Sequence, residues 1–393
     1  MSPSARLLHI AGPSKFGGDS ILILEMGRAA MTRGFTVDVM AADPIFQDKI
    51  RAAGLGLVEC DVIRREIRPV ADVAAVRTLT SLLRATPYDI VHTHTSKPGV
   101  VGRLAASRAG VPAILHTVHL FGFHEETSRL ATAAYVAVER VAARWCDRIV
   151  TVSEHLRRRA LELGIGRPEQ VVAIPNGVPE LRARAQRSPS DVRADLGLGD
   201  GLMILSTGRL AEQKGLEYLV RAVALIGADV PPFHIVLAGD GPLRGDLSAL
   251  VGALGVGDRV HLLGYRDDVG DLLNACDIFV MPSLWEGLSI SLLEAMAAAK
   301  PVITTSIASN CEVTGNGEAA LLVPPKDAAA LAVAITRLVS DPAEQKRLSV
   351  VGREVQRTRY SMVRMLAAYD ELYDELLARP ADRSNARHRR GAG

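Results

Sequence analysis

The sequence has few cysteines, few aromatic residues and no long uncharged apolar run. Its four cysteines lie far apart and form no Cys-x-x-Cys pair, so neither a disulfide framework nor a zinc site is expected. They are Cys60, Cys146, Cys276 and Cys311. No stretch of about 18 apolar residues is free of charge, which predicts no membrane-spanning helix. The apolar run within residues 1–10 is too short for a signal peptide, so we expect a cytoplasmic protein.

Length and charge narrow the class of protein further. A chain of 393 residues suits two domains of roughly 150–200 residues each, and 23% charged residues is typical of a globular protein. The net charge of +2 conceals an asymmetry. Residues 1–190 carry 25 basic and 18 acidic side chains, whereas residues 191–393 carry 21 and 26. The basic first half is consistent with an anionic partner, either nucleic acid or a membrane surface, or with uneven surface composition alone.

Apolar runs of strand length alternate with amphipathic segments of helix length in both halves. In the first half, strands are expected at 7–11, 36–41, 89–93, 113–119 and 148–153, with helices at 19–33 and 97–109. In the second half, strands are expected at 202–207, 234–238, 260–264, 278–281 and 302–305. Such β-α-β alternation produces parallel sheets covered by helices on both faces. The predicted fold class is therefore α/β, with two Rossmann-like domains in tandem.

Domain boundaries follow from the same pattern. The N-terminal domain is predicted over residues 1–178, and the polar, Arg-rich segment 179–190 reads as a linker. The C-terminal domain is predicted over 191–357. A strongly helical segment with an apolar stripe follows within 358–378. The tail 379–393 is rich in Arg, Gly and Ala and is expected to be disordered.

Two glutamates flank the start of a helix after the strand 278–281. Glu286 precedes this helix and Glu294 lies two turns inside it, so their carboxylates should be on the order of 10 Å apart along the axis. That separation matches the reach from a nucleotide ribose to a sugar beyond the pyrophosphate. Gly287 allows close backbone approach, and the helix N-terminus beside Leu288 offers N–H donors to an anion. The structural alternative is one buried, paired glutamate and one capping glutamate.

Other strands of the second half end in cationic or glycine-rich turns. Ligands of open α/β sheets bind at the carboxyl ends of the strands. Arg209 and Lys214 follow the first of these strands and could clamp a diphosphate, or could be solvated surface cations. Gly239 and Gly241 would let a phosphate or base approach the backbone, or would form a tight turn. Tyr265 could contact a base through its backbone.

In the first half, a glycine and several histidines occupy comparable positions. Gly18 belongs to the turn between the first strand and its helix, which alone is not a specific signal. His119 ends the strand 113–119 and is placed to point out of it, although a histidine in a strand more often has a structural role. His92 and His94 end another strand, and His124 lies in the loop after His119.

Taken together, these segments resemble the retaining glycosyltransferases of family 4, which have the GT-B fold. The resemblance covers nearly the whole chain, from Leu7 to Leu377. It rests on PSLWEGLSISLLEAMAAAKPVI, which holds the E-x7-E pair, and on STGRLAEQKG, VLAGDGPLR, HLLGYRDDV, IPNGV and DIVHTHTSKPGVVGRLAA. E-x7-E alone is loose, whereas the ordered set is specific. HTHTSKPGVVGRLAA with HTVHLFGFHEE is most similar to bacterial members that build polysaccharide, O-antigen or glycolipid chains.

The resemblance implies roles for individual residues. A nucleotide-sugar donor would bind mainly to the second domain and the acceptor to the first. Glu294 would bind the ribose hydroxyls, and Glu286 would lie beside the donor sugar. Arg209 and Lys214 would hold the diphosphate, which Gly18 would face from the first domain. The matched segments also contain Gly239, Gly241, Tyr265, Gly287 and Leu288, which are expected to contact the donor.

Further expectations concern the reaction and its setting. His119 matches a strand-end histidine near the reaction centre. The family implies retaining transfer without an enzymatic nucleophile and with no cofactor or metal needed for chemistry. UDP is the expected base, and a lipid-linked or glycan acceptor is the expected partner, with no nucleic acid involved. The helix within 358–378 is expected to cross back and pack on the first domain.

The sequence departs from the family pattern at three places. Leu120 stands where a glycine commonly follows the histidine, residues 308–312 replace a Gly-Gly-x-x-Glu loop, and Ala320 replaces a frequent glycine. These departures leave the sugar pocket and the acceptor open. A sugar-nucleotide epimerase, a phosphorylase and a transferase with a small soluble acceptor remain alternatives. A dinucleotide oxidoreductase is disfavoured because residues 12–18 lack G-x-G-x-x-G spacing, and retention of the site residues disfavours a non-catalytic scaffold.

Basic clusters in the first half raise the question of peripheral membrane attachment. One cluster consists of Arg64, Arg65 and Arg68, and the other of residues 157–159. The second begins a predicted helix that also carries leucines at 156, 161 and 163, so it could lie on an anionic bilayer on the inner face of the cell membrane. A solvated basic helix is the alternative.

Overall fold

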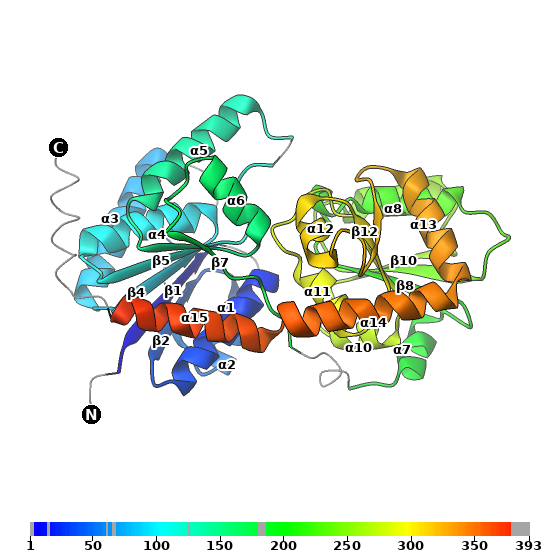
Figure 1. Ribbon diagram of the computed structural model, residues 1–393, viewed down its shortest axis with the longest axis horizontal. Helices are drawn as coiled ribbons and strands as arrows, with labels where there is room; N and C mark the ends of the chain where they lie inside the picture. Colours follow the sequence, from blue (N-terminus) through cyan, green and yellow to red (C-terminus); the bar gives the residue numbers. More distant parts are fainter. Residues whose placement is uncertain are drawn as a thin grey trace. The chain divides into compact units, whose positions relative to one another are not determined.

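The computed structural model describes residues 4–13, 16–59, 62–64, 68–124, 126–179 and 186–378. The chain forms two compact units (Figure 1). The first runs to Pro175 and resumes at Met365, and the second is Asn176–Arg364. The predicted tail 379–393, residues 180–185 of the predicted linker, Cys60 and Arg65 lie outside the described residues.

The first unit is built on a seven-stranded parallel sheet in the order β3-β2-β1-β4-β5-β6-β7. Its strands are β1 (Arg6–Gly12), β2 (Thr36–Ala41), β3 (Gly56–Val58), β4 (Ile90–His94), β5 (Ala113–Val118), β6 (Arg148–Thr151) and β7 (Val171–Ala173). Before Pro175 its helices are α1 (Gly18–Thr32), α2 (Pro44–Ala52), α3 (Pro69–Ala85), α4 (Ser96–Ala109), α5 (Arg129–Ala143) and α6 (Glu154–Glu162). Helices on both faces bury β4 and β5 completely, which explains their continuous low-charge sequences.

The second unit contains a six-stranded parallel sheet in the order β10-β9-β8-β11-β12-β13. The strands are β8 (Leu202–Thr207), β9 (Phe233–Ala238), β10 (Val260–Gly264), β11 (Ile278–Met281), β12 (Val302–Thr305) and β13 (Leu321–Val323). The helical elements are α7 (Pro189–Leu196), η2 (Glu212–Lys214), α8 (Leu216–Leu225), α9 (Arg244–Ala253), α10 (Val269–Ala275), α11 (Ile290–Ala297), α12 (Ala308–Thr314), α13 (Ala328–Ser340) and α14 (Pro342–Arg359).

These two sheets confirm the predicted α/β class with paired Rossmann-like domains. Every predicted strand is present within two residues of its expected bounds. Three strands were not predicted, β3, β7 and β13, each of three residues. They pair with one neighbour only, at the sheet edges, and are too short to show an alternating or continuous apolar pattern.

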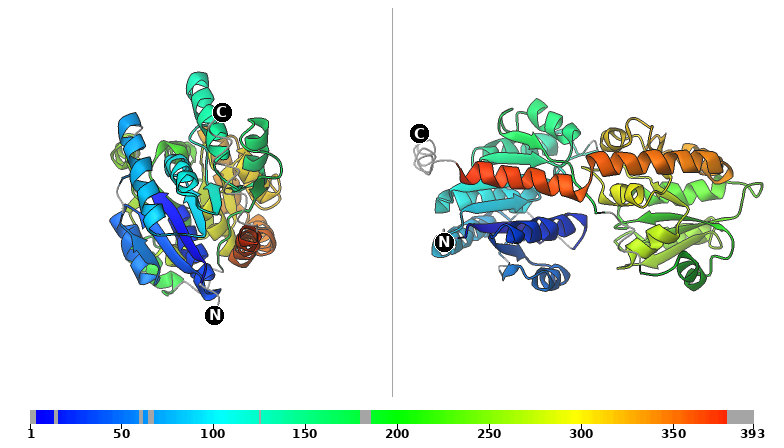
Figure 2. Two further views of the ribbon diagram at one scale, coloured as in Figure 1. Left: turned by 90° about the vertical axis from the view of Figure 1, so that its left-hand side faces the viewer. Right: turned by 60° about the horizontal axis from the view of Figure 1, so that its bottom comes forward.

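The helix predicted within 358–378 is α15 (Met362–Leu377), which is separate from the preceding helix α14. After α14, Ser361 pairs with Val178 in an isolated bridge, and α15 follows. From Met365 onward α15 belongs to the first unit, along which it lies in the right-hand view of Figure 2. The Tyr373 hydroxyl is 2.9 Å from His92 Nδ1, and the Tyr369 hydroxyl is 3.1 Å from Thr117 Oγ1. The stripe of α15 is therefore tied to the sheet through buried hydrogen bonds.

Removing residues 361–393 is expected to destabilise the first unit severely. Met365, Tyr369, Leu372, Tyr373 and Leu376 of α15 are each at most 6% exposed. At roughly 1.5–3 kcal/mol for each buried side chain, their loss approaches the roughly 5–15 kcal/mol that stabilises a whole domain. Thermal unfolding should show the loss, while removal of residues 379–393 alone should leave the melting temperature and activity unchanged. A stable, active protein lacking residues 361–393 would contradict this expectation.

Candidate active site

The sheet of the second unit brings the predicted donor-site segments to one edge. Arg209 follows β8, Gly239 follows β9, Tyr265 follows β10 and Glu286 follows β11. These four strands are consecutive neighbours in the parallel sheet, so their carboxyl ends lie side by side. Ligands of open α/β sheets bind at this edge. The order of strands thus gathers residues that are up to 77 positions apart in the sequence.

Glu286 is the centre of a hydrogen-bond network at this edge. Its Oε1 accepts hydrogen bonds from Lys214 Nζ at 2.5 Å and from Ser283 Oγ at 2.9 Å. Its Oε2 accepts from Gln213 Nε2 at 3.1 Å, and the same amide donates to the Trp285 carbonyl. The side chains of Lys214 and Glu286 are 18% and 9% exposed, so this is a half-buried ion pair. The carboxylate is held in one orientation by three donors.

Close backbone packing explains several glycines of the site. At Gly215, a Cβ atom would lie 2.2 Å from the Pro282 carbonyl oxygen, which fixes the turn that carries Lys214 against the end of β11. At Gly239, φ is +154° and a Cβ atom would lie 1.8 Å from the Gly208 carbonyl oxygen. Its N–H donates to the Gly264 carbonyl at 2.8 Å. The Gly241 N–H donates to the Asp240 carboxylate at 2.8 Å. Gly239 and Gly241 thus form tight turns whose N–H groups are already bonded.

The other predicted donor-site residues differ in exposure. Arg209 is exposed, and within the described residues its guanidinium has no ion-pair or hydrogen-bond partner. Tyr265 is 59% exposed. Glu294 lies half-buried in α11, which begins two residues after the buried Leu288. Beside Arg209, the Thr207 hydroxyl is buried and has no hydrogen-bond partner in the described structure. Within the described structure, the end of β8 therefore carries two groups without a partner, the Arg209 guanidinium and the Thr207 hydroxyl.

In the first unit, His119 lies one residue beyond β5 and is half-buried. Its Nε2 is 3.2 Å from His94 Nδ1 at the end of β4. Burial lowers the pKa of His119, and the Asp19 carboxylate in the first turn of α1 raises it. Gly18 is the first residue of α1, so it lies next to Asp19. The imidazole can donate or accept one hydrogen bond at its free nitrogen.

Stability of the first unit should fall as the pH decreases below about 6.5, the ordinary pKa of histidine. Burial lowers the pKa of His9 to about 3 and those of His92, His94 and His116 well below the usual range. Below this pH the unfolded chain binds more protons than the native state. The free energy of unfolding therefore decreases as the pH falls and reaches its full value only above about pH 6.5.

Urea unfolding at pH 7.5 and pH 5 tests this pH dependence. Aspartate and glutamate ordinarily titrate near about pH 4, so the interval isolates the imidazoles. An equal urea midpoint at both values would contradict the expected loss of stability.

The network around Glu286 includes two residues that the sequence did not single out. Ser283 lies three positions before Glu286, and Gln213 directly precedes Lys214. Both types of side chain are common on protein surfaces, so composition gave no signal. The only available signal was that a polar residue lies within three positions of each predicted charged residue.

The three leucines that were considered for contact with a bilayer differ in burial: Leu156 is buried, whereas Leu161 and Leu163 are half-buried. Leu156 is 4% exposed and packs within the first unit. Arg157 pairs with Glu154 at 3.0 Å and donates to the Val171 carbonyl, and Arg159 pairs with Glu162 at 3.8 Å. Because the core covers Leu156, this leucine is not available to a bilayer, and association of α6 with an anionic membrane stays a prediction. Among the described residues, no helix combines the length and the apolar character needed to cross a membrane.

The fold is of the GT-B type, and the comparisons with known sequences identify the chain as a glycosyltransferase. The chain belongs to the group 1 glycosyl transferases. Residues 190–355 match the family model described as Glycosyl transferases group 1, and residues 17–177 match the Glycosyl transferase 4-like domain. These matches confirm the resemblance found in the sequence.

Two relatives and one solved structure illustrate the range of the family. The chain is 30% identical over 321 residues to UDP-Gal:alpha-D-GlcNAc-diphosphoundecaprenol alpha-1,3-galactosyltransferase of Escherichia coli, covering 80% of this chain and 82% of that protein. It is 31% identical over 297 residues to 2-deoxystreptamine glucosyltransferase of Streptomyces kanamyceticus, covering 72% and 76%. Anabaena HepE in complex with UDP-glucose has the same fold, with a TM-score of 0.82, 21% identity and coverage of 94% and 99%. The chain is thus related to bacterial enzymes of polysaccharide and lipopolysaccharide synthesis.

Proposed function

We propose that the protein transfers a sugar from a UDP-sugar, with retention, to a hydroxyl group of a lipid-linked glycan or glycolipid in bacterial surface polysaccharide synthesis. The observation that carries this proposal is the 2.5 Å contact of Lys214 Nζ with Glu286 Oε1 at the ends of neighbouring strands. This contact supports a site in which Lys214 would meet the diphosphate and Glu286 the sugar hydroxyls. The donor and acceptor named for the Escherichia coli relative support the choice of substrates.

In the proposed reaction, the bond between the anomeric carbon and the diphosphate oxygen breaks. The acceptor hydroxyl oxygen bonds to the same carbon on the face that the diphosphate leaves, and its proton passes to a departing phosphate oxygen. Lys214 and Arg209 would stabilise the growing negative charge. An ammonium group has three donors, so Lys214 keeps two for phosphate while one meets Glu286. We propose these cations, and no metal, for the neutralisation of the leaving group.

A donor and acceptor screen tests the proposed function. Among UDP-, GDP- and ADP-sugars, we expect UDP-sugars to raise the melting temperature, and UDP release to require a polyprenyl-diphosphate-linked glycan. The anomeric configuration of the product, read by NMR, should equal that of the donor. Inverted product would exclude retention, and isomerisation of a UDP-sugar without acceptor would indicate an epimerase.

One relative favours a second candidate function, transfer to a small soluble acceptor. The Streptomyces kanamyceticus protein is named for 2-deoxystreptamine, which is not a lipid-linked glycan. UDP release with aminocyclitols or inositol phosphate, and none with lipid-linked glycans, would favour this alternative.

Peripheral attachment to an anionic membrane is proposed for the presentation of a lipid-linked acceptor. Because Leu156 of α6 is buried, attraction would be mainly electrostatic, at about 1 kcal/mol for each basic residue near the surface. Arg64 and Arg158 are exposed and would contribute to this attraction. Co-sedimentation with phosphatidylglycerol vesicles, absent with phosphatidylcholine vesicles and reversed by salt, is the expected result. Equal sedimentation with both would exclude it.

The two glutamates should separate nucleotide binding from turnover. Glu294→Ala is expected to weaken binding of free UDP on the order of 10-fold or more, because a charged hydrogen-bond acceptor for the ribose is lost. Glu286→Ala should leave UDP affinity intact or slightly higher, because it releases Lys214, and should lower turnover of the UDP-sugar. Calorimetry with UDP and steady-state kinetics measure the two effects. Equal losses of UDP affinity would refute the assigned roles.

A further inference from the structure

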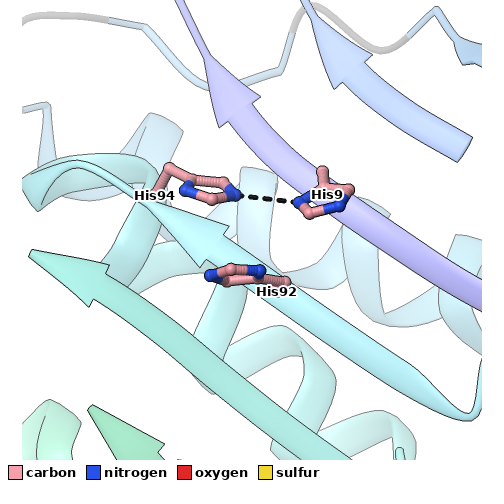
Figure 3. Close-up of side chains that lie close together, drawn as sticks. All are labelled: His9, His92 and His94. Atoms are coloured by element: carbon pink, nitrogen blue, oxygen red, sulfur yellow. Dashed lines mark hydrogen bonds between the residues drawn. The ribbon is translucent and has the colours of Figure 1, made fainter. Parts of the chain in front are cut away.

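A group of buried histidines in the first unit is not used by the proposed reaction. His9 on β1 and His92 and His94 on β4 are all 0% exposed, and their rings lie close together between neighbouring strands (Figure 3). His9 and His92 are register partners in the β1–β4 pair. Polar rings at the centre of a sheet are costly unless their nitrogens are bonded. The hydrogen-bond partners of these ring nitrogens therefore decide how the buried histidines are arranged.

Three of the histidines form a hydrogen-bonded chain that leads to the strand ends. His9 Nδ1 is 3.0 Å from His94 Nε2, the contact drawn in Figure 3. On the other side of the His94 ring, Nδ1 is 3.2 Å from His119 Nε2. The chain thus runs from the fully buried His9 to the half-buried His119.

His92 belongs to a separate network. Its Nδ1 meets the Tyr373 hydroxyl at 2.9 Å and its Nε2 meets the Thr117 hydroxyl at 2.8 Å. Suitable nitrogens of His9, His92 and His94 lie within 4.8 Å of one another, as in a metal site. However, His9 Nε2 is the one ring nitrogen of these three side chains without a partner in the described structure. A metal with three imidazole ligands would have to break existing hydrogen bonds, so the geometry favours a chain of neutral rings.

The unpartnered His9 Nε2 determines which nitrogens donate in the hydrogen bonds from His9 through His94 to His119. A neutral imidazole carries one proton, so each ring donates at one nitrogen and accepts at the other. Buried N–H groups without an acceptor are rare in folded proteins, which places the His9 proton on Nδ1. His9 then donates to His94 Nε2, and His94 must donate from Nδ1 to His119 Nε2. The remaining proton of His119 is consequently on Nδ1, the nitrogen outside the chain.

We propose that His9 and His94 are positioning residues that hold neutral His119 as its Nδ1–H tautomer. This tautomer presents an N–H donor at the carboxyl end of β5, where it would hydrogen-bond an oxygen of the nucleotide-sugar or of the acceptor. Asp19, at the start of α1, raises the pKa of His119 by its charge, against the effect of burial. The catalytic consequence of the tautomer rests on the proposed glycosyl transfer, whereas the tautomer itself does not.

Histidine-selective ¹⁵N NMR of the full-length, ligand-free protein tests the tautomer directly. The His119 signals are assigned by their loss in His119→Gln. We expect Nδ1 to be protonated and Nε2 to be the acceptor at pH 7.5. Protonation at Nε2 would overturn the proposal. Loss of the His9 and His94 proton-coupled signals on addition of Zn²⁺, with recovery in EDTA, would overturn it in favour of a metal site.

Variants of His9 test the effect on catalysis. His9→Leu removes the first donor of the chain, and His9→Asn keeps an N–H at the place of Nδ1. His9→Leu is expected to lower kcat on the order of 10- to 100-fold, as the loss of a hydrogen-bond partner that orients a metal-ligating histidine does, with KM for the UDP-sugar nearly unchanged. His9→Asn should retain most of kcat and the Nδ1–H signal of His119.

The outcomes separate this proposal from the proposed function. Wild-type kcat in a folded His9→Leu protein would overturn the positioning role. Equal loss in His9→Leu and His9→Asn would also overturn it, because packing and not the donor would then matter. An Nδ1–H signal in a protein without transferase activity toward any donor would support the tautomer and refute the proposed function.

Discussion

Lys214→Ala is expected to lower turnover about 100-fold or more, the cost of losing one electrostatic stabiliser of a transition state. The ammonium group lies 2.5 Å from Glu286 and retains two donors, which in the proposed reaction would meet the leaving diphosphate. Because negative charge on the diphosphate grows as the sugar departs, kcat should fall more than the affinity for the UDP-sugar. Steady-state kinetics with the donor identified by the screen measures both quantities.

A matched control for this variant is Lys346→Ala. Lys346 is an exposed lysine on α14 of the same unit, so its removal changes net charge equally without touching the strand ends. We expect wild-type kinetics for the control and a folded protein in both cases, checked by melting temperature. Turnover unchanged in folded Lys214→Ala would remove this lysine from the site. Because Lys214 contacts Glu286, the effects of Lys214→Ala and Glu286→Ala on turnover should be non-additive in the double variant.

Glu139→Gln is expected to destabilise the first unit by about 3–5 kcal/mol, the cost of leaving a buried charge uncompensated. Glu139 on α5 accepts from Arg103 Nη2 on α4 at 2.7 Å, and their side chains are 9% and 0% exposed. Arg103 otherwise donates only to the Gly99 carbonyl, through Nε at 2.8 Å, and its Nη1 has no partner in the described structure. The urea unfolding midpoint measures the loss.

Two comparisons isolate the buried charge as the cause. Glu25→Gln changes the same side chain in an i,i+3 surface pair with Arg28 on α1, and should leave the midpoint nearly unchanged. The double variant Arg103→Met, Glu139→Leu replaces both charges by apolar groups and should recover most of the lost stability. If Glu139→Gln unfolds at the wild-type urea concentration, the pair does not stabilise the core.

The sequence alone determined the order of elements and the strand ends at which the candidate site lies. Strands β8 and β11, buried on both faces, read as continuous apolar runs, so their ends and the residues after them could be predicted. The resemblance to family 4 added roles for Arg209, Lys214 and the two glutamates. These are local properties, because a strand end and a motif each occupy a short stretch of chain.

Tertiary structure decided which of these residues touch. Lys214 and Glu286 were predicted as separate contacts to diphosphate and sugar, yet they form one ion pair across 72 positions of sequence. Gly239 and Gly241 were expected to let a phosphate or base approach the backbone, or to form tight turns. The structure shows the turns, in which both N–H groups are bonded, and the donor contact stays a prediction.

The chain from His9 to His119 is likewise a product of the fold. It joins β1 to β4 across 85 positions and then β4 to the end of β5 across 25. Which nitrogen meets which depends on strand order, register and ring rotation, and no pattern along the chain encodes these directly. The sequence therefore identified the strand ends, and the packing of parallel strands decided which side chains meet there, because hydrogen bonds join atoms that are near in space whatever their separation in sequence.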